Sequence, residues 1–464
     1  KVSDFAANHP TLDRICRPLG MYHVYTSVWF SAIYLLLFIS LIGCIVPRIV
    51  SHAKALRRQP PRVPARLDRL AAHASMTTSA SAAEVSQRAQ QWLTSHRYRF
   101  VVDDDGSLRA EAGRHRETGN LVFHIFLVFV LVGVGWNTLW GFKGTSVVVE
   151  GQGFSNSITQ YDEFKAGAMV DTDNLTPFSM KLRKFVVSFE TGTVQRGAAR
   201  SFDATVDLTM GGKTQTRDLQ VNHPLRIGST KVHLLGHGYA ADVVVRDGDG
   251  KVAYSGPVVF LPQDANFKSV GVIKAPDARP DRLAFQGFFL PTGAITAGGP
   301  TSLFPDALNP QLYLTAWYGK PTVETGVPSN IYTLDTTGLT QVTNGKDKAR
   351  FVLSPGQRYK LPDGKGSIQF NGWQRWAKIQ VSQNPGLPLT FLSVVLSVAG
   401  LCVSLFSRSR RVWVRTIPGD DGLRVEIGGL DRSDSRSGAV DDVNSLLAAL
   451  HGDSMSGDVG EEHS

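Results

Sequence analysis

The chain has 464 residues, enough for roughly two or three domains, and its hydrophobic fraction of 42% is ordinary for a soluble protein. Its net charge is +9, but the basic residues gather beside apolar runs instead of forming one face of a folded domain, which argues against a nucleic-acid-binding protein. Its three cysteines include no CxxC pair, so a disulfide framework and a zinc ribbon are both excluded.

Residues 1–27 are expected to lie outside the cell and to contain a short helix over Pro10–Gly20. The apolar face of this helix would include Leu12, Ile15 and Leu19. Because the chain begins at Lys1 and this segment must have been delivered across the membrane, we expect a further span upstream of it.

Three long apolar runs contain no Asp, Glu, Lys or Arg and approach the ~20 residues that a helix needs to cross a bilayer. They predict membrane-spanning helices at residues 28–46, 119–142 and 387–406. Pro47, followed by Arg48, is expected to end the first of these helices. The sequence therefore predicts a membrane protein.

Basic residues flank the three runs on one side, which by the positive-inside rule is the cytoplasmic side. They are Arg48, Lys54, Arg57 and Arg58 after the first run, Arg114 and Arg116 before the second, and Arg408, Arg410, Arg411 and Arg415 after the third. Trp29, Trp136 and Trp140 fall at the opposite ends, where an aromatic belt is expected. Segments 47–118 and 407–464 are therefore predicted to be cytoplasmic, and 143–386 to be extracytoplasmic.

The two cytoplasmic segments have mirrored local patterns. In the first, Ser81 and Glu84 form a capping box for a helix that ends at Ser95, and residues 97–112 are typical of a β-hairpin. In the second, residues 412–430 predict a hairpin, and a helix over 440–450 would bury Val440, Val443, Leu447 and Leu450. We expect the two segments to pack into one small α+β domain, because neither alone buries a sufficient core. The tail from Gly452 is expected to be disordered.

The external region 143–386 is predicted to be a large all-β, sandwich-like domain. Its strand signals are Ser146–Glu150, Lys184–Glu190, Ser201–Met210, Thr214–Val221, Lys231–Leu235, Ala241–Arg246, Val252–Phe260, Gln311–Tyr318 and Ser367–Trp373. Trp373 and Trp376 are expected at the membrane surface just before the third span, and an apolar platform for a flat cofactor is the alternative.

Three histidines fall in this external region: His223, His233 and His237. On an extended strand His233 and His237 would share a face, which would suit a metal or haem. However, the glycines on both sides of His237 indicate a turn, and no carboxylate stands at ligand spacing. Structural roles are therefore favoured for all three.

One histidine, His124, lies inside the second apolar run. An ionisable group in hydrocarbon is a functional candidate by default, because no water is present to hydrogen-bond it. From the residues alone His124 is either a ligand or proton carrier, or a structural histidine that bonds a neighbouring helix. Its helical face continues through Leu127, Val128, Leu131 and Gly135, which we expect to serve ordinary helix packing.

Long ordered stretches resemble the ResB family of System II cytochrome c biogenesis, in its actinobacterial form. These stretches include VYTSVWFSAIYLLLFISLIGCIVPR, GNLVFHIFLVF around His124, VVVEGQGFSNS, LGHGYAADVVVRDGDG, SLFPDALNP, LPDGKGSIQFNGW and SLFSRSRRVWVR. The resemblance extends over nearly the whole chain. It implies a multi-pass protein of the plasma membrane with four spans and a large extracytoplasmic domain.

The resemblance also implies a function. A ResB protein works with a ResC-type polytopic subunit to carry haem across the membrane and attach it to the CxxCH motifs of apocytochromes c. His124 matches a position that supplies an axial ligand to haem b, so both a cofactor and a metal role are expected for it. Thiol-reducing, thioredoxin-like proteins are further expected partners.

No nucleophile–base–acid set, paired-carboxylate site or phosphate loop is evident in the external region, so a hydrolase is not supported. The chain alone is expected to have no catalytic activity, although the complex would act as a cytochrome c synthase. The alternative function is a scaffold that binds no haem and docks apocytochrome and the ResC-type partner through its β-rich domain.

Overall fold

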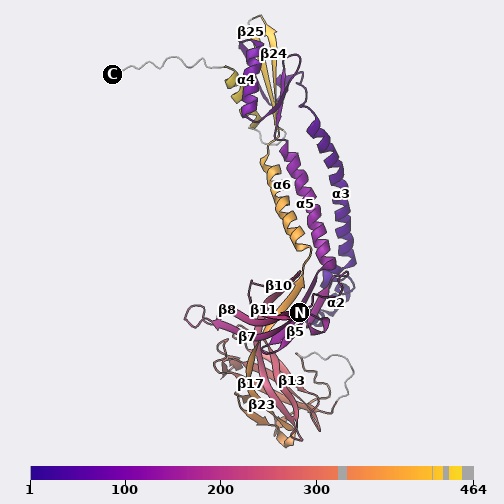
Figure 1. Ribbon diagram of the computed structural model, residues 1–464, viewed down its shortest axis with the longest axis vertical. Helices are drawn as coiled ribbons and strands as arrows, with labels where there is room; N and C mark the ends of the chain where they lie inside the picture. Colours follow the sequence, from indigo (N-terminus) through magenta and orange to yellow (C-terminus); the bar gives the residue numbers. More distant parts are fainter. Residues whose placement is uncertain (1, 322–331, 421, 432–437, 452–464) are drawn as a thin grey trace, which may run out of the picture. The chain divides into compact units, whose positions relative to one another are not determined.

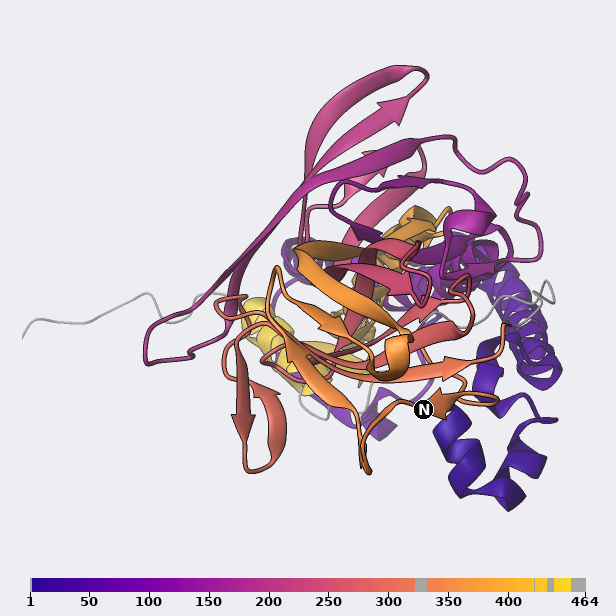
Figure 2. The ribbon, with the colours of Figure 1, turned by 90° about the horizontal axis from the view of Figure 1, so that it is seen from below.

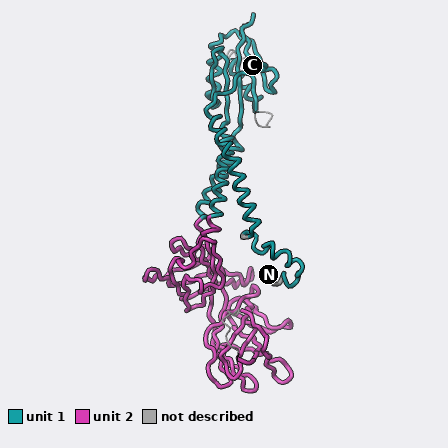
Figure 3. Tube along the Cα trace, turned by 90° about the vertical axis from the view of Figure 1, so that its right-hand side faces the viewer, with its two compact units in different colours: residues 1–135, 386–464 teal, residues 136–385 magenta. Residues whose placement is uncertain are grey.

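The computed structural model describes residues 2–321, 332–420, 422–431 and 438–451. The chain divides into two units, one formed by residues 1–135 and 386–464 and the other by residues 136–385 (Figure 3). The predicted disorder of the tail from Gly452 lies outside the described residues.

The first unit contains most of the helices (Figure 1). They are α1 Val2–Asn8, α2 Pro10–Cys16, η1 Met21–Thr26, α3 Val28–Arg57, η2 Leu67–Arg69, α4 Ala82–Ser95, α5 His115–Trp140, α6 Leu387–Phe406 and α7 Gly438–His451. The last residues of α5 belong to the second unit. The helix expected over Pro10–Gly20 ends at Cys16, and its apolar face stays uncovered, with Leu12 50% and Ile15 56% exposed.

Among the described residues, α3, α5 and α6 are long and apolar enough to cross a membrane. The expectation that Pro47 ends the first of them is wrong, because Pro47 lies inside α3, which continues to Arg57. A proline in a helix removes one hydrogen bond and costs about 3 kcal/mol, so the rest of this 30-residue helix must offset that cost. The added turns extend the helix through its basic flank.

Helix α5 packs closely on α6 because glycines face one another at their contact. A Cβ on Gly119 would lie 2.6 Å from the carbonyl oxygen of Gly400, and one on Gly400 would lie 2.7 Å from the amide nitrogen of Phe123. The buried hydroxyl of Ser397 donates to the carbonyl of Phe123 at 3.2 Å. Small residues at such a contact let two backbones approach in a membrane, where van der Waals packing drives association.

Helix α3 lies along α5, as two polar contacts near its ends show (Figure 1). The Tyr34 hydroxyl donates to the carbonyl of Leu131, and a ring nitrogen of His52 lies 3.0 Å from the hydroxyl of Thr118. Between them Ile45 is 5% exposed. Since Ile45 lies about 10 Å along α3 from His52, it falls near the height of His124 on α5.

The remaining part of the first unit is an antiparallel sheet in the order β1-β25-β24-β3-β2. Its strands are β1 Ala72–Thr78, β2 Arg99–Val102, β3 Leu108–Ala112, β24 Arg410–Gly419 and β25 Gly422–Asp431. Helices α4 and α7 share one hydrophobic core with this sheet. Segments 47–118 and 407–464, which were expected to pack together, therefore contribute to one sheet and one core.

Most of the local features that the sequence predicts for this unit are confirmed. The capping box of Ser81 and Glu84 begins α4, and the Glu84 amide lies 3.3 Å from the Ser81 hydroxyl. The expected stripe of α7 is partly wrong, because Ala439 and Leu446 are buried where Val440 and Leu447 were expected. A Cβ on Gly429 of β25 would lie 3.1 Å from the carbonyl oxygen of Ala439, so α7 packs closely against the sheet at this glycine and Ala439 is buried there.

The second unit is β-rich. Its strands are β4 Phe142–Val149, β5 Gly153–Ser155, β6 Glu163–Ala166, β7 Ser179–Phe189, β8 Ala199–Met210, β9 Lys213–Gln220, β10 Leu225–Ile227, β11 Thr230–Asp247, β12 Val252–Pro262, β13 Ser269–Ala275, β14 Arg282–Leu290, β15 Gly293–Thr296, β16 Gly299–Ser302, β17 Gln311–Gly319, β18 Thr340–Gln341, β19 Thr343–Asn344, β20 Asp347–Lys348, β21 Arg350–Leu353, β22 Arg358–Lys360 and β23 Gly366–Gln383. Short 3-10 turns are η3 Ile158–Gln160 and η4 Pro362–Gly364.

A large sheet runs in the order β18-β17-β14-β13-β12-β11-β23-β4-β6, and a smaller one in the order β5-β7-β8-β9. Strands β11 and β23 pair along their whole length and join two cores. One end of the pair packs against the small sheet, where Phe185, Val206, Leu234 and Ile379 meet. The other end faces a core shared with β12–β14, β17 and β21, so the large sheet curls around it (Figure 2).

The expected turn at His237 is absent, because β11 continues through this residue as one strand with a bulge at Leu235. Gly238 is required for a different reason, because a Cβ there would overlap the ring of Trp376. The prediction that Trp376 lies at the membrane surface is likewise wrong: it is 3% exposed, and its indole N–H donates to the carbonyl of Tyr239 at 3.0 Å. Trp376 and Trp373 both lie within β23.

Candidate functional site

His124 lies within α5, between its polar first turns and its apolar middle. Its Nδ1 lies 2.7 Å from the carbonyl oxygen of Asn120, one helical turn earlier. A carbonyl only accepts, so Nδ1 carries the proton and donates. Nε2 is then the unprotonated nitrogen, and it has no hydrogen-bond partner among the residues that the structure describes.

This arrangement is the one that a metal-binding imidazole requires. A ligating histidine usually donates its other ring N–H to a carbonyl or carboxylate, which sets the tautomer and orients the ring. The His124 ring is half-buried, and the ring of Phe123 stands edge-on to it with centroids 4.9 Å apart. The residues present therefore fit one axial position on a haem iron through Nε2.

On the face of α5 that carries His124, the residue one turn before it is polar and the residues after it are apolar. Leu127 and Leu131 continue its face toward the far end and are half-buried, while Asn120 lies on the near side. Within the described chain there is no group of three or more His, Cys, Asp or Glu side chains that could hold a metal ion. A single imidazole with an apolar flank suits a cofactor that brings its own coordinating ring, not a bare cation.

The histidines of the second unit do not assemble into a site. Leu234 pairs with Ile379 and Gly236 with Lys378, so Leu235 is an extra residue that reverses the side-chain alternation. His237 therefore faces the core beside Ala377, whereas His233 faces the other way. His233 and His237 therefore do not share the face that a regular extended strand would give them.

His237 is instead buried among aromatic rings. It is 7% exposed, and the ring of Phe267 stacks on it with centroids 4.6 Å apart. Near it lies Arg375, whose Nη2 pairs with Asp306 at 2.7 Å and whose guanidinium sits 4.9 Å from the Tyr239 ring centroid. Burial, with Arg375 as the second cause, lowers the pKa of His237 from 6.5 to about 4. A structural role follows.

This depressed pKa predicts a pH-dependent stability. As pH falls from about 6.5 to about 4, the unfolded chain takes up a proton at residue 237 and the folded chain does not, so stability falls over that window by on the order of 3 kcal/mol. We expect His237→Gln to flatten this slope in unfolding curves of the full chain in detergent. His223→Gln, at an exposed position, should leave it unchanged. Equal slopes for wild type and His237→Gln would contradict the expectation.

Sequence reasoning missed the role of Asn120, since a backbone carbonyl has no residue-specific signal. It also missed β13 and β14, although the apolar composition of SVGVIKA and RLAFQGFFL is a strand signal that could have found them. The strand that it predicted over Ser201–Met210 is confirmed as part of β8, and Ala204, Val206 and Leu208 are buried on one face of it.

Three helices of spanning length joined to a large β-rich unit define the class: a membrane protein with a β-rich domain. A model of the ResB-like family matches residues 1–440. The chain belongs to this family.

Curated relatives are similar over much of the chain. A protein named cytochrome c biogenesis protein CcsB from Synechococcus sp. (strain JA-3-3Ab) is 24% identical over 86% of this chain and 72% of its own length. The protein of that name from Microcystis aeruginosa is 21% identical over 89% of this chain and 77% of its own length. That from Picosynechococcus sp. is 28% identical over 45% of this chain and 42% of its own length.

Proposed function

We propose that this chain is a haem-handling subunit of a membrane complex of the System II type, which assembles c-type cytochromes. Its membership of the ResB-like family and its similarity to the CcsB proteins support this class of function. In this role the complex carries haem across the membrane for covalent attachment to the CxxCH motifs of apocytochrome c. The side chains of this chain bind and orient, and we assign them no catalytic step.

The observation that carries the proposal is the state of His124. Its Nδ1 is held by the Asn120 carbonyl, and its Nε2 is left for a ligand in a helix that is otherwise apolar at that height. When bound, haem would supply an iron that accepts a neutral imidazole nitrogen. His124 would hold this iron through Nε2, and the Asn120 carbonyl would orient the imidazole.

We propose that the second ligand comes from another chain. The other histidines of the long helices are His52, whose ring nitrogen already contacts Thr118 at 3.0 Å, and His115, which is exposed in the first turn of α5, about 14 Å along the helix from His124. The lateral surfaces of α3 and α6 carry exposed apolar side chains that could meet either lipid or a partner helix, among them Leu36 at 68% and Phe391 at 70%. We therefore propose a ResC-type polytopic subunit as the partner that completes the haem site.

Orientation follows from charge. The unit with the five-stranded antiparallel sheet carries the basic flanks of all three long helices, which supports a cytoplasmic position for it in the plasma membrane and an extracytoplasmic one for the β-rich unit. His124 lies about 14 Å along α5 from His115, so it is nearer to the proposed cytoplasmic end. This depth suits the receipt of haem b from the cytoplasmic side.

The competing function is a scaffold that binds no haem and docks apocytochrome through its β-rich unit. The two functions differ in what His124→Ala does to the yield of holo-cytochrome c in cells that depend on this chain. We expect the yield to fall by at least ~10-fold, because loss of a ligand should cost no less than loss of its supporting bond. Haem-stained gels of membrane fractions measure the yield.

The matched control is His52→Ala, which removes a histidine from the neighbouring helix whose ring nitrogen is already engaged by Thr118. It should leave the yield near that of the wild type at equal chain abundance. Full yield with His124→Ala would reject the ligand role and leave the scaffold.

A further inference from the structure

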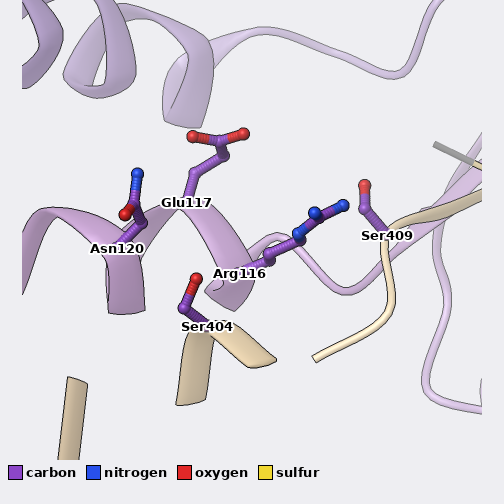
Figure 4. A pocket seen from close by; sticks show the side chains of 5 residues that line it. All are labelled: Arg116, Glu117, Asn120, Ser404 and Ser409. Carbon is purple, nitrogen blue, oxygen red and sulfur yellow. The ribbon is translucent and has the colours of Figure 1, made fainter. Parts of the chain in front are cut away.

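A polar cavity of about 380 Å³ lies where the first turns of α5 meet the end of α6. It is lined by Arg116, Glu117 and Asn120 of α5, by Ser404 of α6 and by Ser409, which follows α6 (Figure 4). This volume is far more than the ~10–15 Å³ that one water molecule needs, so the cavity is large enough for a pair of hydrated carboxylates.

Helix packing creates this cavity at a defined place. A Cβ on Gly119 would lie 2.6 Å from the backbone nitrogen of Ser404, so the glycine lets the end of α6 approach the start of α5. The side chains on either side of Gly119 then surround the hollow beside this contact. The hydroxyl groups of Ser404 and Ser409 and the side-chain amide of Asn120, which line the cavity, can all donate hydrogen bonds to an anion.

The Arg116 guanidinium is half-buried and makes no hydrogen bond or ion pair with any residue that the structure describes. Its neighbour Arg114 differs, since it pairs with Glu111 at 3.3 Å and also donates to the carbonyl of Ala55. Figure 4 shows Arg116 extending toward Ser409 and the Glu117 carboxylate pointing away from it. A planar cation with five donors and no internal partner suits a carboxylate or phosphate.

The cavity lies before His124 along α5, and Asn120, which lines the cavity, is one helical turn from His124. Arg116, Asn120 and His124 follow one another at intervals of four residues, so they share one side of α5. Side chains on a helix lean toward its N-terminus, which brings the imidazole toward the cavity, and the bond to Asn120 holds it there. Asn120 thus belongs to both features, through its carbonyl and its side chain.

We propose that this cavity binds the propionate carboxylates of the haem whose iron His124 ligates, with Arg116 as their counter-ion. This inference rests on the proposed function. The order along α5 matches an amphipathic ligand: a cation and hydroxyls at the near end, the imidazole next, and the apolar Leu127 and Leu131 beyond. The cavity would fix which edge of the porphyrin faces the aqueous end of the helix.

The test compares haem with haem dimethyl ester, which has the same iron and ring but no carboxylate charges. Absorption titrations of the full chain in neutral detergent give the affinity for each form. We expect Arg116→Gln to weaken binding of haem by about tenfold or more, as loss of a charge-assisted hydrogen bond predicts, and to leave the ester unaffected. Arg116→Lys, which keeps the charge, should retain most of the preference for haem.

Two further variants separate this inference from the proposed function. Arg408→Gln removes a nearby exposed cation that does not line the cavity, and it should change neither affinity. His124→Ala should weaken both forms alike, so its failure to do so would reject the iron ligand without touching the carboxylate site.

Equal affinities of wild type and Arg116→Gln for haem would overturn the carboxylate site, as would an equal loss for haem and its ester. A lipid phosphate is the other anion with this chemistry. If Arg116→Gln instead reduced retention of phosphatidylglycerol in mixed nanodiscs and left the haem preference intact, the cavity would be a lipid site and the proposal would be wrong.

Discussion

Gly400→Leu is expected to separate α5 from α6 and to destabilise the chain by about 3 kcal/mol or more. A Cβ at this position would already lie 2.7 Å from the Phe123 amide nitrogen and 2.9 Å from the Gly119 carbonyl oxygen, and both atoms are backbone. Backbone cannot rotate out of the way, so the helices must move apart. Thermal unfolding of the purified chain in detergent measures the effect.

The matched control is Gly43→Leu in α3, where a Cβ would meet nothing within 4 Å. Leucine has a higher helix propensity than glycine by up to ~1 kcal/mol, so this variant should be neutral or slightly more stable. Gly400→Leu should also weaken haem binding more than Gly43→Leu does, since Ser404 of α6 lines the proposed carboxylate cavity. Similar melting temperatures for the two variants would show that the glycine contact does not support the structure.

The elements with strong local signals could be predicted from the sequence. Ser81 and Glu84 cap α4 as the spacing of a hydroxyl and a carboxyl indicates. The buried face of α4 also follows from the sequence, because apolar residues at helical spacing mark one side of an amphipathic helix. Its buried residues are Val85, Ala89, Trp92 and Leu93.

Features that depend on distant chain segments could not be predicted. The glycine pattern around His237 is compatible with a turn, and only the pairing of β11 with β23 shows that Gly238 makes room for Trp376. The extra residue Leu235 likewise leaves no mark in the sequence, yet it decides which histidine faces the core. Register is a property of two strands together.

The candidate site shows the same division. His124 could be singled out because a titratable residue in an apolar run is unusual. Its orientation could not, because the acceptor is the backbone of Asn120. The position of Arg116 was equally hidden, because only the packing of α5 on α6 shows that this basic residue lines a cavity and that no described residue pairs with its guanidinium.

His124→Gly is expected to remove haem from the chain, with a loss of affinity of at least ~100-fold. It deletes the proposed Nε2 ligand and leaves a space the size of an imidazole beside Asn120. A glycine inside a helix costs only ~1 kcal/mol, so the chain should remain folded. The haem content of the purified chain, normalised to protein, measures the loss.

Adding imidazole to this variant tests the central claim most directly, through the visible absorption spectrum of the reduced, haem-supplemented complex of this chain with its proposed partner subunit. If Nε2 of His124 ligates the iron, free imidazole should enter the vacated space and restore the low-spin bands of the wild type, while leaving the wild-type spectrum unchanged. A low-spin spectrum in His124→Gly without imidazole, equal in intensity to that of the wild type, would contradict the account.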